Sequence, residues 1–215
     1  MSAGWALCAV WCVSLAPAFA QAPPLNDAPV TTFGVTVVDG FGLRGDIYLL
    51  KPETEFLPNF KKMKPVGSIY TRSLNIPPRD FQEGFPGVTD RFEWFAIDYN
   101  GYFYISEPGK YRFNVASDDG SKLYIDGKRV VDNDGLHPVK AEQGQINLKG
   151  GIHTLRLSYF QGPRTNLALV LGVARPGEEW RIFSTSDFQP PRDPKDWKYG
   201  DPNKLPPLFT DRLKK

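Results

Sequence analysis

Apolar and polar residues alternate with a period of two along much of this chain. In the segment 110–117, KYRFNVAS, the apolar residues Tyr111, Phe113 and Val115 are separated by polar ones. Successive side chains of a strand point to opposite faces, so the pattern predicts a strand with one buried face. Similar alternation, or a short apolar run, predicts further strands at 33–38, 45–50, 68–74, 91–99, 102–106, 122–125, 128–131, 144–148, 152–160 and 166–173.

Turn motifs separate the predicted strands. Asn100-Gly101 and Asp126-Gly127 are typical of tight two-residue reversals, and Pro108-Gly109 marks another turn. Six prolines between residues 51 and 91 predict irregular structure there, because proline lacks an N–H donor. Strands that recur about every ten residues predict an all-β fold, an antiparallel β-sandwich or barrel-like domain of jelly-roll type.

The first 20 residues carry no charge and end in Ala18-Phe19-Ala20. This small-x-small ending after an apolar run predicts a secretory signal peptide that is cut after Ala20, and therefore a secreted, periplasmic or cell-surface protein. An uncleaved membrane anchor is the alternative. No membrane span is expected in the mature chain.

The remaining sequence divides into three parts. Residues 21–32 form a predicted linker and 33–188 the β domain, while 189–215 form a tail rich in Pro and Lys. The tail is expected to be irregular but partly ordered, because Trp197 and Leu208 can dock, as can Phe209.

Charge and cysteine content exclude several classes of function. Lys and Arg number 26 against 24 Asp and Glu, which gives no electrostatic reason to expect nucleic acid or an anionic membrane as a partner. Both cysteines, Cys8 and Cys12, lie in the predicted leader. The mature chain therefore has no thiolate nucleophile, disulfide or Cys-ligated zinc.

Two adjacent acids, Asp118 and Asp119, stand where one predicted strand ends and the next begins. In extended backbone their side chains would diverge, so convergence on one ion requires a sharp bend or a cis peptide. Calcium suits such a pair because it takes 6 to 8 oxygen ligands from flexible loops, and Gly120 allows the chain to turn beside it. An ordinary Asp-containing turn is the alternative.

Residues 91–173 resemble the domain family named after the anthrax protective antigen, the PA-14 (PA14) domain. The resemblance is carried by IDYNGYFYISEPGKYRFNVASDDGSKLYIDGKRVVDNDG and INLKGGIHTLRLSYFQGPRTNLALVL. Within them stand, in order, G-x-Y-x-F, S-D-D-G-S, L-x-I-D-G and G-x-H-x-[IL]. The resemblance implies a β-sandwich of a kind found in glycosidases, adhesins and toxins.

In lectin-type members, such as yeast flocculins and bacterial adhesins, an acidic pair joined by a cis peptide holds a calcium ion that coordinates sugar hydroxyls. Asp118 and Asp119 match that pair. A second loop supplies an amide oxygen in those members, and Gln161 occupies the corresponding place, with Asn166 as the alternative. Arg164 lies in the same loop and is expected to hydrogen-bond a glycan.

Other chemistry-bearing residues are expected to be structural. The acids of DNDG, 132–135, lack the later Glu of an EF-hand and are interpreted as a turn beside the cation site. His153 is expected to be partly buried on the face of Leu155. A catalytic arrangement of His137 with Ser117 or Ser121 lacks a nucleophile elbow, so an enzyme is not expected.

Acids and aromatic residues elsewhere are weaker candidates. Glu93 and Asp98 lie in a strand that is apolar on both faces and are expected to be structural. Tyr99, Tyr102, Tyr104 and Tyr124 can stack on sugar rings, although most aromatic residues of a sandwich pack in its core.

The sequence thus predicts a secreted lectin-like module that recognises glycan through calcium held by Asp118, Asp119 and Gln161. The alternative is a structural or interaction module of the cell envelope that contacts an envelope protein and has no sugar site.

Overall fold

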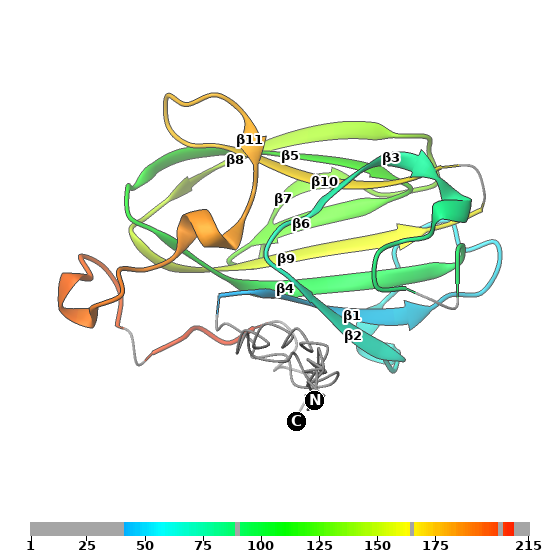
Figure 1. Cartoon of the computed structure of the whole chain (residues 1–215), viewed down its shortest axis with the longest axis horizontal. Coiled ribbons are helices and arrows are strands. Elements are labelled where there is room, and N and C mark those ends of the chain that lie inside the picture. Colours follow the sequence, from blue (N-terminus) through cyan, green and yellow to red (C-terminus); the bar gives the residue numbers. More distant parts are fainter. Residues whose placement is uncertain (1–40, 89–90, 164–165, 202–203, 209–215) are drawn as a thin grey trace, which may run out of the picture. The chain divides into compact units, whose positions relative to one another are not determined.

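The structure is a computed structural model that describes residues 41–88, 91–163, 166–201 and 204–208 (Figure 1). The predicted leader, the linker and the strand at 33–38 lie outside these ranges. Within the described ranges, no helix is long and apolar enough to cross a membrane.

The described residues form two antiparallel sheets. Their strands are β1 Leu43–Leu49, β2 Gly67–Thr71, β3 Asn75–Asp80, β4 Phe95–Ile105, β5 Gly109–Asp118, β6 Ser121–Ile125, β7 Lys128–Asn133, β8 Lys140–Leu148, β9 Gly151–Gln161, β10 Asn166–Ala174 and β11 Arg181–Ile182. Short 3-10 turns lie at η1 Phe60–Lys62, η2 Phe81–Glu83, η3 Thr185–Phe188 and η4 Pro194–Asp196. One sheet has the order β2-β1-β4-β9-β6-β7 and the other β11-β10-β5-β8, with β3 also paired to β10.

The core lies between the two sheets, as the period-two pattern requires. Tyr111, Phe113 and Val115 of β5 are all buried, while alternate residues of the strand are more exposed. Stacked Phe183 and Phe188, with ring centroids 5.2 Å apart, extend the core beyond β11. The prediction of an all-β antiparallel sandwich is confirmed.

Both faces of β4 are buried along all eleven of its residues. One face belongs to the core between the sheets. Part of the other face is covered by the segment after β1, where Phe60 packs on Tyr48 with centroids 4.9 Å apart and joins a small cluster with Ala96 and Phe160. This cover explains why the β4 sequence is apolar on both faces of the strand.

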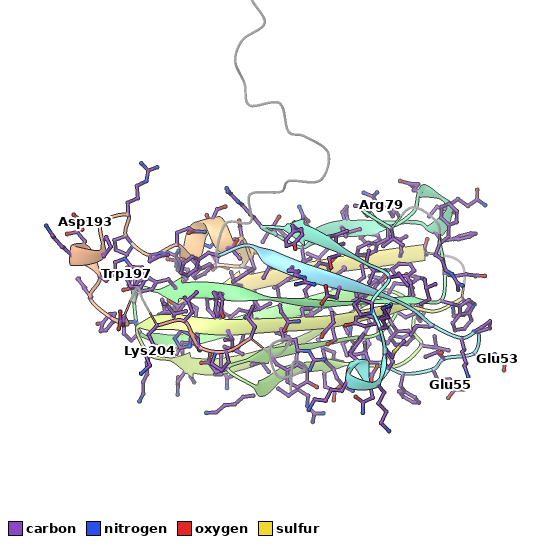
Figure 2. All side chains as sticks on the ribbon, turned by 90° about the horizontal axis from the view of Figure 1, so that it is seen from below. Glu53, Glu55, Arg79, Asp193, Trp197 and Lys204 are labelled. Atoms are coloured by element: carbon purple, nitrogen blue, oxygen red, sulfur yellow. The ribbon has the colours of Figure 1, made fainter. Side chains whose placement is uncertain are left out.

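The C-terminal segment covers another part of that outer face. The Tyr104 hydroxyl donates to the carbonyl of Tyr199 at 3.2 Å, and the Trp197 ring lies 5.4 Å from the Tyr104 ring. The Tyr102 hydroxyl donates to the carbonyl of Pro206 at 2.6 Å. Figure 2 shows Trp197 at the end of the sandwich opposite to Glu53. Trp197 therefore docks as expected, and Phe209 lies outside the described residues.

The reversal predicted at Asn100-Gly101 is wrong, because β4 continues through both residues. Gly101 is required for a different reason. A Cβ at position 101 would lie 2.5 Å from the carbonyl oxygen of Gly42, so the close approach of the chain before β1 requires glycine there.

The strand predicted at 68–74 is confirmed in part by β2, which spans Gly67–Thr71. The irregular structure predicted for the rest of 51–91 is wrong at β3, which contains Pro77 and Pro78. β3 pairs only with β10, with a register irregularity between Leu167 and Leu169. Proline is tolerated in such a strand because one of its edges needs no ladder hydrogen bonds.

The turn at Asp126-Gly127 is confirmed. Both residues have positive φ, 50° and 77°, and they join β6 to β7 as a tight hairpin.

Candidate cation site

The acidic pair lies where β5 ends and β6 begins. The Asp118–Asp119 peptide is cis, as the family resemblance implies, and each residue is only 5% exposed. A Cβ at Gly120 would lie 2.4 Å from the Phe160 ring and 2.8 Å from the backbone nitrogen of Gly135. Glycine is therefore needed for the chain to pass between β9 and the loop that follows β7.

The Asp119 carboxylate joins two loops. Its Oδ1 accepts the backbone N–H of His137 at 3.1 Å, and its Oδ2 accepts the backbone N–H of Gly162 at 2.8 Å. Burial raises the pKa of Asp119, while these two hydrogen bonds and the nearby His137 partly oppose the rise. Part of the hydrogen-bonding capacity of this carboxylate is therefore used in holding the loops.

The Asp118 carboxylate has less compensation. Burial and then the charge of Asp119 raise its pKa to about 6, against weaker opposing effects of His137 and of the Val139 backbone. Among the described residues, neither acid forms an ion pair with Lys or Arg. Two buried carboxylates thus lie together with His137 nearby but without a Lys or Arg partner among the described residues, although buried charges in proteins are normally paired or bind a metal.

Gln161, the predicted third ligand, closes the site from β9. Its Nε2 lies 3.5 Å from Oδ2 of Asp119 and donates to the backbone carbonyl of Asn166 at 3.1 Å. The structure therefore brings Asp119, Gln161 and the main chain of Asn166 together. Arg164 lies outside the described residues.

A buried tyrosine hydroxyl sets the orientation of the Gln161 amide. The Tyr159 hydroxyl lies 2.7 Å from the carbonyl oxygen of Asp118 and 2.5 Å from Oε1 of Gln161. Burial, with the charges of Asp119 and Asp118, raises the pKa of Tyr159 well above its usual value, so the hydroxyl keeps its proton. One proton serves only one of these two oxygen acceptors.

A half-turn of the amide would remove this conflict but would break the hydrogen bonds that Nε2 donates to Asp119 and to the carbonyl of Asn166. Nε2 of Gln161 would then donate to the Tyr159 hydroxyl, and Tyr159 would donate to Asp118. Oε1 would face the Asp119 carboxylate and the carbonyl of Asn166. Three oxygens without a proton between them repel one another unless a cation lies among them.

The donor set fits calcium better than a transition metal. Among the described residues, no group of three or more His, Cys, Asp and Glu side chains lies close enough to hold a metal ion. Two carboxylates, an amide oxygen and a backbone carbonyl are hard oxygen donors, which calcium takes in numbers of 6 to 8. Such a set leaves positions on the ion for water or for ligand oxygens.

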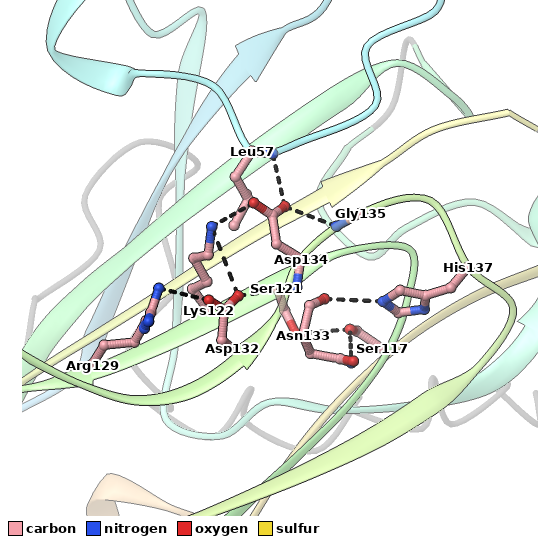
Figure 3. Close-up of polar contacts among 10 residues, drawn as sticks. All are labelled: Leu57, Ser117, Ser121, Lys122, Arg129, Asp132, Asn133, Asp134, Gly135 and His137. Carbon is pink, nitrogen blue, oxygen red and sulfur yellow. Dashed lines mark hydrogen bonds and ion pairs between the residues drawn. The ribbon is translucent and has the colours of Figure 1, made fainter.

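Figure 3 shows the polar contacts of the DNDG segment, residues 132–135. Asp134 Oδ1 accepts the backbone N–H groups of Leu57 and Gly135 at 2.9 Å and 3.0 Å, and its Oδ2 pairs with Lys122 Nζ at 2.5 Å. Its acids form hydrogen bonds and ion pairs within the chain, but the turn predicted at 132–135 is wrong in part, because β7 continues through Asp132 and Asn133.

The Ser-His arrangement does not assemble. Ser117 and Ser121 are fully buried and hydrogen-bond each other at 2.7 Å (Figure 3). The ring nitrogens of His137 instead contact the carbonyl oxygens of Asn133 and Pro138, each at 2.9 Å. Neither serine is positioned for proton transfer to this histidine.

His153 and Asp98 have structural contacts. His153 is 8% exposed and lies between Asp126 and the carbonyl of Lys149. Asp98 pairs with Arg156 at 2.7 Å on the outer face of β4.

Comparison with solved structures identifies the same architecture. The PA14 domain of the antifreeze protein MpAFP matches with a TM-score of 0.58 at 18% identity, over 71% of this chain and 93% of its own. A domain described as the PA14 sugar-binding domain from an RTX adhesin matches with a TM-score of 0.55 at 18% identity, over 69% and 97%. At these identities the likeness concerns the fold.

A third similar structure is larger than this chain. An anti-sigma factor domain-containing protein from Clostridium clariflavum matches with a TM-score of 0.54 at 22% identity, over 71% of this chain and 48% of its own. This chain thus corresponds to about half of that protein. Among curated proteins, none matches the sequence.

The sequence pattern that defines the PA14 domain matches residues 64–183, more than half of the chain. The match includes the acidic pair, Gln161 and every strand from β2 to β11. The chain belongs to the PA14 domain family.

Proposed function

We propose that this PA14 domain binds carbohydrate through a calcium ion held by Asp118, Asp119 and Gln161. The observation that carries the proposal is the pair of buried carboxylates that have no Lys or Arg partner among the described residues. A cation would compensate both charges and would be favoured by a half-turn of the Gln161 amide. The similar RTX adhesin domain, which is described as sugar-binding, supports the same function.

The role of each group follows from its surroundings. Asp118 would contribute most of the electrostatic attraction, because its carboxylate has the least compensation in the chain. Asp119 would ligate the ion while it keeps the two loops together through His137 N and Gly162 N. Neighbouring sugar hydroxyls would replace water on the ion, with Arg164 and Asn166 beside them.

The affinity for one sugar is expected to be low. A shallow contact with a monosaccharide supplies about −4 kcal/mol, a Kd near 1 mM. Retention on a glycan surface would then depend on repeated ligands or several copies of the domain. We further propose a secreted or surface location and a non-catalytic role, which suit this mode of binding.

Calcium dependence and the acidic pair can be tested together. We expect calcium to raise the melting temperature. At a free calcium concentration of 100 times the Kd, the free energy of unfolding should rise by about 2.7 kcal/mol. Asp118→Asn should abolish this effect, yet stabilise the protein in a chelator, since it removes a buried charge with a raised pKa. Asp132→Asn is the matched control, because this nearby acid is 40% exposed and pairs with Arg129.

Glycan-array binding with and without a chelator then tests the function itself. Binding that persists in the chelator would contradict the calcium mechanism.

The contacts of Asp119 favour a second candidate, a structural or interaction module of the envelope. Both carboxylate oxygens accept backbone N–H groups, which is sufficient reason for an acid at this position. Under this alternative, Asp119→Asn loosens the loops, calcium leaves the melting temperature unchanged, and the array shows no binding.

A further inference from the structure

A second pocket opens on the outer face of the six-stranded sheet. It encloses about 220 Å³ between the sheet and the segment that follows β1. Neither Asp118 nor Asp119 lines it. Its walls include three aromatic rings, those of Tyr48, Phe60 and Tyr124.

The floor of the pocket is polar and buried. Asp98, which is 5% exposed, accepts Arg156 Nε and the Ser158 hydroxyl on Oδ1, both at 2.7 Å. The Arg156 guanidinium lies 5.6 Å from the Phe60 ring centroid and 5.7 Å from that of Tyr124. The ion pair and the rings hold the guanidinium in a fixed position.

The Tyr48 hydroxyl lacks a protein partner. The residue is 2% exposed and lines the pocket, yet its hydroxyl makes no hydrogen bond within the described part of the chain. Burial, and then the charges of Asp46 and Asp98, raise the pKa of Tyr48 to about 12, so the group is a donor at neutral pH. The hydroxyl is not among the enclosed polar atoms that lack a partner, so it faces the pocket and is free to donate to water or to a ligand acceptor.

Basic residues outnumber acidic ones among the residues that line the pocket. Lys61, Lys122 and Arg156 line it, against Asp98 alone. Asp134 and Asp132 compensate Lys122 from behind the wall (Figure 3), and Asp98 compensates Arg156. Among the described residues, Lys61 is the lining cation without an ion pair, and with the Tyr48 hydroxyl it favours a ligand that is rich in acceptors and carries one negative charge.

The volume limits the ligand to a small molecule, because sites for drug-sized ligands start at about 300 Å³. Aromatic walls favour the C–H face of a sugar ring, whereas Lys61 and the Tyr48 hydroxyl favour a carboxylate. We propose that this pocket binds one carboxylated sugar ring, a hexuronate, independently of calcium.

The test is an NMR titration of the ¹⁵N-labelled protein with D-glucuronate in the presence of a chelator. Amide chemical shifts are expected to move at 57, 59–61, 122–124 and 156–158. Tyr48→Phe keeps the ring on Phe60 but removes the donor, and should weaken binding at least about tenfold, as for the loss of a hydrogen bond to a charged group. Tyr70→Phe is the matched control, since Tyr70 is exposed and lies outside the pocket.

D-Glucose and acetate test the two parts of the ligand. Both are expected to bind at least about tenfold more weakly than glucuronate, because each lacks either the carboxylate or the ring. The proposal is overturned if glucuronate shifts no pocket residue, if Tyr48→Phe binds like the wild type, or if glucose or acetate binds equally well. Since a chelator is present throughout, each result is independent of the calcium site.

Discussion

The His153–Asp126 pair should make the stability of this domain depend on pH. His153 Nδ1 lies 2.6 Å from Asp126 Oδ2, and its Nε2 lies 2.8 Å from the carbonyl oxygen of Lys149. Both partners are acceptors, so both ring nitrogens must carry a proton. Asp126 also accepts the backbone N–H of Thr154 at 2.9 Å, which ties the β6–β7 turn to β9.

The sign of the pH dependence follows from the two pKa shifts. Burial lowers the pKa of His153, but the hydrogen bonds to Asp126 and Lys149 outweigh it and the net shift is upward. Burial raises the pKa of Asp126, but the contacts with His153 and Thr154 outweigh it and the net shift is downward. The pair therefore stabilises the fold between the ordinary pKa of Asp, about 3.9, and that of His, about 6.5.

Above that window, stability should fall as pH rises through the pKa of folded His153. Each unit by which this pKa exceeds its unfolded value corresponds to about 1.4 kcal/mol. The Asp126 side chain is 42% exposed, so solvent screens the pair. We therefore expect a loss of about 1 kcal/mol from this pair between pH 5.5 and 8.5.

Asp126→Asn is the appropriate variant, because Asn tolerates the positive φ of 50° at this position. Its amide oxygen can still accept from Thr154, but its NH₂ would face Nδ1 of His153 and favour the neutral ring. Urea unfolding followed by tryptophan fluorescence at pH 5.5 and 8.5 should show a smaller difference for the variant than for the wild type. NMR titration should show a lower pKa for His153, with His137 as an internal reference.

Equal pH dependence in the two proteins would refute this account of the pair. An unchanged His153 pKa in Asp126→Asn would do so as well.

Three further substitutions test packing. Gly144→Ala should destabilise by about 1–3 kcal/mol in urea unfolding, because its Cβ would lie 1.8 Å from the carbonyl oxygen of Val130. Gly67→Ala is the control, because the atom nearest to its added Cβ would lie 4.0 Å away. Equal losses of stability in the two variants would contradict the packing argument. Tyr104→Phe should cost about 1 kcal/mol and speed limited proteolysis near Tyr199, since it removes a hydrogen bond to that carbonyl. An unchanged cleavage rate would show that this bond does not hold the segment.

Much of the fold was predictable because, along a single strand, the buried positions follow the two-residue period of the apolar residues in the sequence. The alternation through Tyr111, Phe113 and Val115 identifies β5 without any long-range information. The errors arise where a residue responds to a distant neighbour. Gly101 permits close approach of the chain at Gly42, although next to Asn it has the local signature of a turn.

The two sites differed in how far the sequence could predict them. Asp118 and Asp119 are adjacent in the chain and belong to a recognisable motif, and the family resemblance added Gln161. The second pocket has no local signature. Tyr48, Phe60 and Arg156 come from β1, a 3-10 turn and β9, and only the pairing of β1 and β9 with β4 brings them together.

Composition was also a poor guide to the local electrostatics. The chain is nearly neutral, with 26 basic and 24 acidic residues. Yet two buried acids lie together without a Lys or Arg partner in the described chain, and three basic residues line one pocket with a single acid. Buried charges are screened much less than exposed ones, so these local fields and not the net charge govern what binds. Under the two proposals made above, the acids would take a cation and the pocket a carboxylate, and both kinds of group occur on or around acidic glycans.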